Sequence, residues 1–367
     1  MITRTVFSAI GLDMLPDRVR LLQLKCQGEL LSIHEAAQAE VKGKGKEGMG
    51  LLDALRKVLS GRKLKGNHVM AALPGHMVTT IPIRFSLKEG EGIEQAILRE
   101  AHNYLSFPLE KGVIDYLNLP LSDQRSSKAA LLIASKREDI VNCLDLFKQA
   151  GLDASVIEPR YCSLFRTIQW ARQGEPLKDQ FIFSMEENLT MLMVIVDEQI
   201  LVVREVAWGV NTIREKVGKA LGLSGKKVDR ILQQYGVDPG NPQDFSQEKA
   251  ASFLLDDREL RQVISEVLSP ILEDLCQEIQ KVLSYCVSLV QQRVIDRALL
   301  LGEGARIRFL DRFVQQRTGI QVSTWPGVSI LNELAEVPAF FEVALGLTLR
   351  GMKNRLPGRP AACPGGA

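Results

Sequence analysis

Two glycines in the sequence Leu301-Gly302-Glu303-Gly304-Ala305 stand where a backbone could hold a ligand. An apolar run, Ala298 to Leu301, precedes them, and the spacing of apolar residues predicts a helix from Ile307 to Gln316 after them. Glycine lets the backbone approach a ligand, and the N-terminus of a helix favours anions. The pattern is therefore typical of a turn that holds a phosphate or an adenine ring. The alternative is structural: Gly302 and Gly304 merely end a strand and open a helix.

Asp13 is the second candidate for chemistry. Its carboxylate could take part in general or metal-linked chemistry, or it could cap backbone groups as a turn aspartate. The cysteines and histidines show no CxxC, HExxH or HxH spacing, so we expect reduced cysteines and no structural zinc. They are Cys26, Cys143, Cys162, Cys276, Cys286, Cys363, His34, His68, His76 and His102.

The composition excludes several classes of protein. With 367 residues, of which 46% are hydrophobic and 25% charged, the chain is an ordinary globular protein of more than one lobe. Its formal net charge of +2 provides no overall basic field for nucleic acid. The most apolar run, Leu189 to Val196, is too short to cross a membrane. The first residues lack a signal-peptide pattern, so we expect a cytoplasmic protein.

A basic stretch departs locally from this charge balance. Between Lys42 and Lys65, eight Lys or Arg residues outnumber Glu47 and Asp53 and leave a charge of +6 over 24 residues. The stretch could face anionic lipid, or it could be a solvated loop. Because no aromatic residues interleave the charges, nucleic acid is disfavoured. The cations are Lys42, Lys44, Lys46, Arg56, Lys57, Arg62, Lys63 and Lys65.

The apolar runs predict two halves that begin alike. Three short runs predict a three-stranded meander in each half, and in the first half a helix and a strand follow. Meander, helix, strand is how one half of an actin-like or ribonuclease-H-like domain begins. The first half uses Val6 to Leu15, Arg18 to Lys25, Leu30 to Val41, a helix within Leu51 to Leu59, and His68 to Leu73; the second uses Phe181 to Met185, Leu189 to Val196 and Ile200 to Val206.

Between the halves, residues 79–158 predict a small α+β subdomain inserted into the larger fold, because their elements follow the order β-α-β-β-α-β. The first of its helices runs from Ile93 and should end near Leu105 or Ser106, since Pro108 biases Phe107 away from helical geometry. A further helix, Cys162 to Arg172, leads back out of it.

The second half is rich in predicted helices. Apolar residues at steps of one, three or four predict one long amphipathic element from Leu260 to Val290, kinked near Pro270. Its apolar stripe could pack on a sheet, which we favour, or on a partner coiled coil. Other helices are predicted at Val210 to Leu221, Gly225 to Tyr235 and Pro338 to Leu349.

These features together resemble the PilM family of type IV pilus assembly, a relative of FtsA and of the cytoplasmic part of the type II secretion L protein. The segment Glu100 to Glu110, EAHNYLSFPLE, with Asp115-Tyr116 after it, is similar to the family's EAxxYIPFPLEE…DY segment. Other short matches follow in the expected order: Ala71 to Gly75, Ala150 to Leu152, Arg204-Glu205 with Gly209, and Leu301 to Ala305. The resemblance implies an α/β, actin-like, two-lobed fold with the inserted α+β subdomain.

The resemblance also implies a nucleotide site for ATP with magnesium, and this sequence departs from the family there. Asp13 is followed by Met14-Leu15-Pro16 in place of glycine and small hydroxyl residues. Glu186 and Glu187 replace the family's small residues in the second phosphate loop, and Leu232 stands where the adenosine helix has lysine. We therefore expect weak or lost ATP binding and no enzymatic activity. The vestigial site would comprise Asp13, Thr190, Gly209, Asp229, Gly302 and Gly304.

Two hypotheses of function follow. In the first, which we favour, the chain is a scaffold that binds the cytoplasmic N-terminal tail of a PilN-like inner-membrane protein, works with other pilus assembly proteins and is peripheral to the membrane. In the second, it is an actin-fold enzyme that binds or hydrolyses ATP. The resemblance places the tail between the first lobe and the inserted subdomain, at Ile81, Ile83, Ile97, Ala101, Tyr104 and Phe107. Phe107 could instead be a core residue.

The expected domain organisation combines these predictions. Residues 1–78 form the first lobe, 79–158 the inserted subdomain, 159–180 the return to the first lobe, and 181–350 the second lobe with a helical subdomain at about 210–257. Residues 351–367 are rich in proline and glycine and should form a disordered tail.

Overall fold

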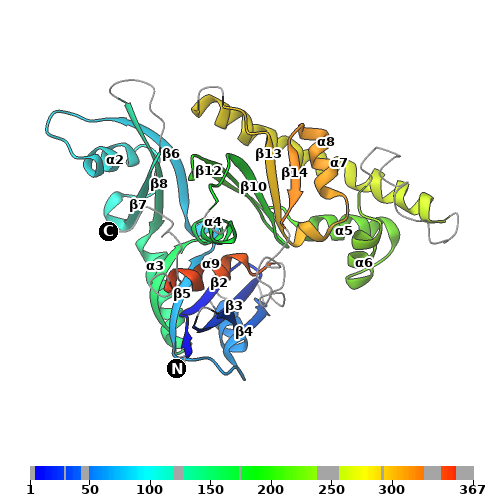
Figure 1. Ribbon diagram of the computed structural model, residues 1–367, viewed down its shortest axis with the longest axis horizontal. Helices are drawn as coiled ribbons and strands as arrows, with labels where there is room; N and C mark the ends of the chain where they lie inside the picture. Colours follow the sequence, from blue (N-terminus) through cyan, green and yellow to red (C-terminus); the bar gives the residue numbers. More distant parts are fainter. Residues whose placement is uncertain are drawn as a thin grey trace. The chain divides into compact units, whose positions relative to one another are not determined.

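The computed structural model describes residues 5–28, 30–42, 49–119, 127–172, 175–237, 256–290, 293–325 and 340–352 (Figure 1). The chain forms two compact units. The first comprises residues 1–177, 197–201 and 326–367, and the second comprises residues 178–196 and 202–325.

The first unit is built on a six-stranded sheet with the order β1-β3-β2-β5-β9, in which β4 also pairs with β3. The first predicted run is two strands rather than one, because the Ser8 hydroxyl oxygen accepts the Leu24 N–H and interrupts the pairing of the first run with β3. The strands are β1 (Thr5–Phe7), β2 (Ile10–Met14), β3 (Arg18–Gln27), β4 (Leu30–Glu40), β5 (His68–Leu73) and β9 (Asp153–Pro159).

Helices pack on this sheet through two apolar cores. One core joins Leu12 of β2 to α1 (Met49–Leu59) and α3 (Arg137–Gln149). The other joins Leu22 and Leu24 of β3 to α9 (Glu342–Gly351), which also contacts α4 (Arg160–Ala171). The prediction that residues up to 350 belong to the second lobe is therefore wrong for α9. Its apolar side chains are buried against β3, and Gly346 allows its backbone to approach Ser163.

The inserted subdomain is smaller than predicted. Its three strands pair in the order β6-β8-β7, with α2 (Ile93–Ala101) covering one face (Figure 1). The boundary at residue 158 is wrong, because β9 pairs with β5 in the first sheet, and Phe147 of α3 lies in that sheet's core. The strands are β6 (Thr79–Ser86), β7 (Gly112–Leu119) and β8 (Ser127–Lys136).

The helix α2 also ends earlier than predicted. The helix ends at Ala101, four residues before Leu105. The Tyr104 and Leu105 N–H groups both donate to the Ala101 carbonyl, so a turn follows the last helical residue. Pro108 then begins the short 3-10 turn η2 (Leu109–Lys111) that leads into β7. The proline therefore shapes the segment after the helix and not the end of the helix itself.

The second unit contains a five-stranded sheet with the order β12-β11-β10-β13-β14. Strands β10 and β13 are parallel and β10 and β11 antiparallel, so the predicted meander and the later strand share one sheet. The strands are β10 (Gln180–Met185), β11 (Thr190–Val196), β12 (Gln199–Val206), β13 (Arg297–Gly302) and β14 (Gln321–Thr324).

Four α-helices accompany this sheet among the described residues, and α5 begins directly after Gly209, one of the residues assigned above to the vestigial nucleotide site. They are α5 (Val210–Leu221), α6 (Lys226–Gln234), α7 (Asp256–Leu289) and α8 (Leu310–Thr318). A 3-10 turn, η4 (Glu303–Arg306), follows β13, and α8 begins at Leu310, three residues after the predicted start at Ile307.

The long helix α7 buries its stripe within the second unit, as favoured above. Leu268, Leu272, Ile279 and Cys286 are buried, and the helix packs against α5, α8 and β11. Pro270 lies inside this helix.

Candidate functional site

The predicted nucleotide residues of the second unit gather at one end of its sheet. Strands β10 and β13 run parallel, with Met185 paired to Gly302, so their carboxyl ends lie side by side. The residues after β10, Gly302 at the end of β13, Gly304 in η4 and the N-terminus of α5 meet there. In open α/β sheets the carboxyl ends of parallel strands are the usual place for a ligand.

The turn after β10 is bonded to the start of α5. The Glu186 carbonyl accepts the Val210 N–H at 2.9 Å, and the Glu187 carbonyl accepts the Asn211 N–H at 2.8 Å. Gly209 makes this approach possible, because a Cβ atom there would lie 2.5 Å from the Glu187 carbonyl oxygen. Two N–H groups of the first turn of α5, which could otherwise bind an anion, are therefore used inside the protein.

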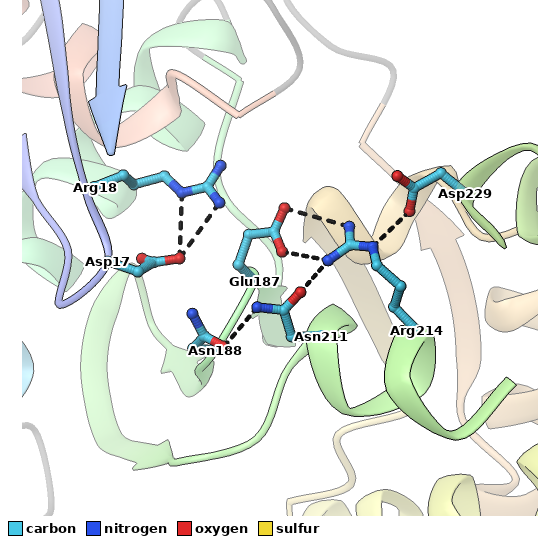
Figure 2. A network of polar contacts seen from close by, with 7 residues as sticks. All are labelled: Asp17, Arg18, Glu187, Asn188, Asn211, Arg214 and Asp229. Carbon is cyan, nitrogen blue, oxygen red and sulfur yellow. Dashed lines mark hydrogen bonds and ion pairs between the residues drawn. The ribbon is translucent and has the colours of Figure 1, made fainter. Parts of the chain in front are cut away.

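An arginine joins two acidic residues at this site (Figure 2). Arg214 of α5 donates from Nη1 to Glu187 Oε2 at 2.7 Å and from Nε to Asp229 Oδ1 of α6 at 2.8 Å. Burial lowers the pKa of Arg214, but the two hydrogen bonds outweigh it, and the pKa is raised above its ordinary value. We call these three residues the Arg214 bridge.

Two asparagines extend the Arg214 bridge from the start of α5 to the β10–β11 turn (Figure 2). Asn211 accepts a hydrogen bond from Arg214 and donates from Nδ2 to Asn188 Oδ1 at 2.8 Å. Nothing in the sequence indicates the role of Arg214, because its partners lie 27 residues before it and 15 residues after it, and no local spacing pattern links them.

Gly302 and Gly304 are required by packing against Met185. Gly302 has a φ of +76°, and a Cβ atom there would lie 2.6 Å from the Met185 carbonyl oxygen. A Cβ atom at Gly304 would lie 2.6 Å from the Met185 Cβ and 2.7 Å from its Sδ. Both glycines therefore have a structural role, because they allow the end of β13 and the turn η4 to pack against Met185 of β10.

Thr190 is also engaged by the protein. It begins β11, its side chain is buried, and its hydroxyl donates to the Trp208 carbonyl at 2.8 Å. This bond links the β10–β11 turn to the residues just before α5.

Asp13 lies in the first unit, within a buried cluster of charges. Arg160 donates to it from Nε at 2.7 Å and from Nη2 at 3.2 Å, and Arg20 Nη1 lies 3.8 Å from Asp13 Oδ2. The Arg20 guanidinium also lies 5.0 Å from the centre of the Phe340 ring. Asp13 is therefore an ion-pair partner between two arginines, which neither sequence hypothesis foresaw.

Most of the chain matches one protein family. The model of the type IV pilus assembly protein PilM matches residues 11–352. The chain belongs to this family. The match covers both units, so the resemblance seen in the short motifs is confirmed.

Solved structures show the same actin-like fold. A chain of a PilM–PilN type IV pilus biogenesis complex is 21% identical, with a TM-score of 0.71, and the similarity covers 94% of this chain and 98% of that one. The ethanolamine utilization protein EutJ from Carboxydothermus hydrogenoformans is 13% identical, with a TM-score of 0.52, over 95% of this chain and 91% of its own. The predicted actin-like fold is confirmed.

Three of the residues assigned to the partner surface of this PilM-family protein are not available to a partner. Ile83, Ile97 and Ala101 are at most 2% exposed and form the core between α2 and the sheet of the inserted subdomain. The assignment is wrong for these residues because Ile97 and Ala101 of α2 pack against the sheet that carries Ile83, so all three lie inside the subdomain. Ile81 is partly buried against the same core.

Tyr104 and Phe107 lie beyond the end of α2 and are more accessible. Tyr104 is 47% exposed, and Phe107 is half-buried, with its Cε2 atom 3.0 Å from the position that a Cβ of Gly112 would take. Phe107 therefore combines a packing contact with an accessible surface: its ring packs on the start of β7, and part of the residue stays exposed.

Over the described ranges, none of the helices combines the length and the apolar content that a membrane crossing needs. In the same part of the chain, no group of three or more His, Cys, Asp or Glu side chains is arranged to hold a metal ion.

Proposed function

We propose that the chain is a scaffold of type IV pilus assembly that binds the cytoplasmic N-terminal tail of a PilN-like inner-membrane protein. The observation that supports this most is membership of the PilM family over residues 11–352. The similar solved chain comes from a complex of PilM with PilN, which names the partner by family. Such a scaffold would work in the cytoplasm, peripheral to the membrane through its partner.

We further propose that the scaffold does not turn over nucleotide, because the side chains at the expected site do not fit a polyphosphate. Glu186 and Glu187 are buried carboxylates at the end of β10, and like charge repels phosphate. Arg214, a cation in contact with Glu187, is shared with Asp229. The N–H groups that begin α5 are bonded to carbonyls.

Asp13 supports the same proposal from the first unit. A carboxylate that positions a nucleotide or its magnesium must be available to it, whereas Asp13 is bonded through both oxygens to Arg160. A role in binding nucleotide would require Asp13 to give up its two hydrogen bonds with the buried Arg160 guanidinium, which is costly.

A calorimetric titration of the full chain with Mg-ATP tests this second proposal. We expect no binding up to about 1 mM, where the free energy of binding is about −4 kcal/mol. Stoichiometric binding at micromolar concentration, with hydrolysis, would instead support the actin-fold enzyme.

A second titration tests the scaffold. A labelled peptide from the N-terminal tail of the PilN-like protein should bind with micromolar affinity, because a short disordered peptide loses entropy when it docks. Tyr104→Ala should weaken this binding at least tenfold. Tyr285→Ala is the matched control, since Tyr285 of α7 is exposed to a similar extent, 44% against 47%. Failure of the peptide to bind at about 1 mM would reject the scaffold without bearing on ATP.

A further inference from the structure

A basic surface lies on the outer side of α1 and on the loop after it. Ten consecutive residues from Arg56 to Lys65 include five cations and no acidic residue. All five side chains are exposed in the structure. We call this surface, formed by Arg56, Lys57, Arg62, Lys63 and Lys65, the basic face.

The helix α1 directs its cations away from the sheet. Ala54, Leu55 and Val58 are buried in the core beneath the helix. Arg56 and Lys57 lie on the opposite, exposed side, together with Asp53 three residues before Arg56. Asp53 is the only acidic residue of α1, so the outer side of the helix keeps a net positive charge.

The loop after α1 is held in place by side chains of β3 and β4. Gln23 donates from Nε2 to the Lys65 carbonyl at 2.8 Å and accepts the Lys65 N–H at 2.9 Å. His34 Nε2 lies 2.8 Å from the Lys63 carbonyl oxygen, and Glu35 accepts the Lys63 N–H at 3.1 Å. The backbone of the basic loop is therefore anchored at two residues while its charged side chains extend into solvent.

We propose that the basic face binds the headgroups of an anionic lipid bilayer. A bilayer surface presents many negative charges to exposed cations and requires no pocket and no specific contact. Nucleic acid is disfavoured, because single strands are held by aromatic stacking and no aromatic residue occurs between Arg56 and Lys65. Each Lys or Arg near such a surface contributes about a fivefold increase in the partition constant.

This proposal does not depend on the tail-binding function. If both hold, the basic face gives a scaffold tethered through a peptide a second contact with the same membrane, and two weak contacts acting together bind more tightly than either.

Vesicle flotation with the full chain tests the proposal. The protein should bind vesicles that contain about 30% phosphatidylglycerol at about 0.1 M salt, and should not bind vesicles of phosphatidylcholine alone. Binding should disappear at about 0.5 M salt, where screening shortens the range of the attraction. The double variant Arg62→Gln/Lys65→Gln should reduce the partition constant about 25-fold, and its melting temperature should not change because both side chains are exposed.

A matched double variant, Lys216→Gln/Lys219→Gln on α5, removes the same charge from exposed positions elsewhere and should change the partition constant less than twofold. An equal loss in both double variants would overturn the proposal, since only overall charge would then matter. Equal binding to both kinds of vesicle would overturn it as well. Tighter binding to a short DNA duplex than to the vesicles, lost in Arg62→Gln/Lys65→Gln, would assign the face to nucleic acid.

Discussion

Arg160 Nε lies 2.7 Å from Asp13 Oδ1, and both side chains are 1% exposed. This pair joins the first residue of α4 to the second strand of the first sheet, across 147 positions of the sequence. It ties together two elements that also bury apolar surface in the same unit.

Asp13→Ala should therefore act on stability. The substitution leaves Arg160 and Arg20 buried without their carboxylate, which costs about 3 kcal/mol or more in the free energy of unfolding. Chemical denaturation measures this. A variant that kept its stability but lost measurable ATP binding would show that Asp13 is a ligand residue.

Removing the Arg214 bridge should loosen α6 from the β10–β11 turn. Arg214→Gln should lower the free energy of unfolding by about 2 kcal/mol, because two charge-assisted hydrogen bonds are lost. A double-mutant cycle of Arg214→Gln with Glu187→Gln should show coupling of about 1 kcal/mol. Arg230→Gln, at an exposed position of α6, is the control and should be nearly neutral. Zero coupling would mean that the bridge contributes nothing.

Glu158 should make stability depend on pH. Burial raises its pKa, but hydrogen bonds from Arg166 and Ser163 outweigh burial and hold it below the ordinary value of 4.5. The folded state thus favours the carboxylate, so its contribution is complete above pH 4.5 and is lost as pH falls through the lower, folded value.

The variant Glu158→Gln should therefore be destabilised by about 3 kcal/mol at pH 7 and approach the wild type below pH 4.5. Unfolding curves from pH 7 to pH 3 measure the difference. A constant difference over that range would contradict the assigned ion pair.

Gly302 and Gly319 both have a positive φ, but they differ in ψ and in what a side chain would meet. Gly302 has a φ of +76° and a ψ of −163°, a combination that only glycine adopts readily, whereas Gly319 has a φ of +73° and a ψ of 4°, in the left-handed helical region. A Cβ atom at Gly302 would also meet Met185, and nothing lies within 4 Å of a Cβ atom at Gly319. Gly319→Ala should therefore cost about 1 kcal/mol, and Gly302→Ala about 1 to 3 kcal/mol more through backbone strain and contact together. Melting curves compare the two variants. Equal losses would show that neither the backbone nor the contact with Met185 requires glycine at position 302.

Much of the fold could be predicted because its elements carry strong local patterns. The predicted helix Val210 to Leu221 matches α5, and the long stripe of α7 is buried as favoured. The placement of β9 and α9 could not be predicted, because it depends on pairing with β5 and on packing with α4, both remote in sequence.

The candidate site shows the same limit. The glycines and glutamates could be placed near one another from the resemblance, since they follow parallel strands. Arg214 could not be placed there from the sequence. A helix that carries lysine and arginine has the same sequence pattern whether its arginine is exposed to solvent or bonded to carboxylates. The burial of Ile97 and Ala101 was missed because an amphipathic helix does not reveal which surface covers its apolar side.

The return of α9 to the first sheet has a consequence for biosynthesis. A chain that emerges from the ribosome in order exposes Leu22 and Leu24 long before Ala344 and Leu345 exist to cover them. Chains arrested before residue 340 should therefore be cleaved in the first unit by a protease that spares the same segment in the full chain. The second unit, made of residues 178–196 and 202–325, can fold before the last helix of the first unit has been synthesised. During synthesis, the first unit is therefore made first but stays exposed to proteolysis longest.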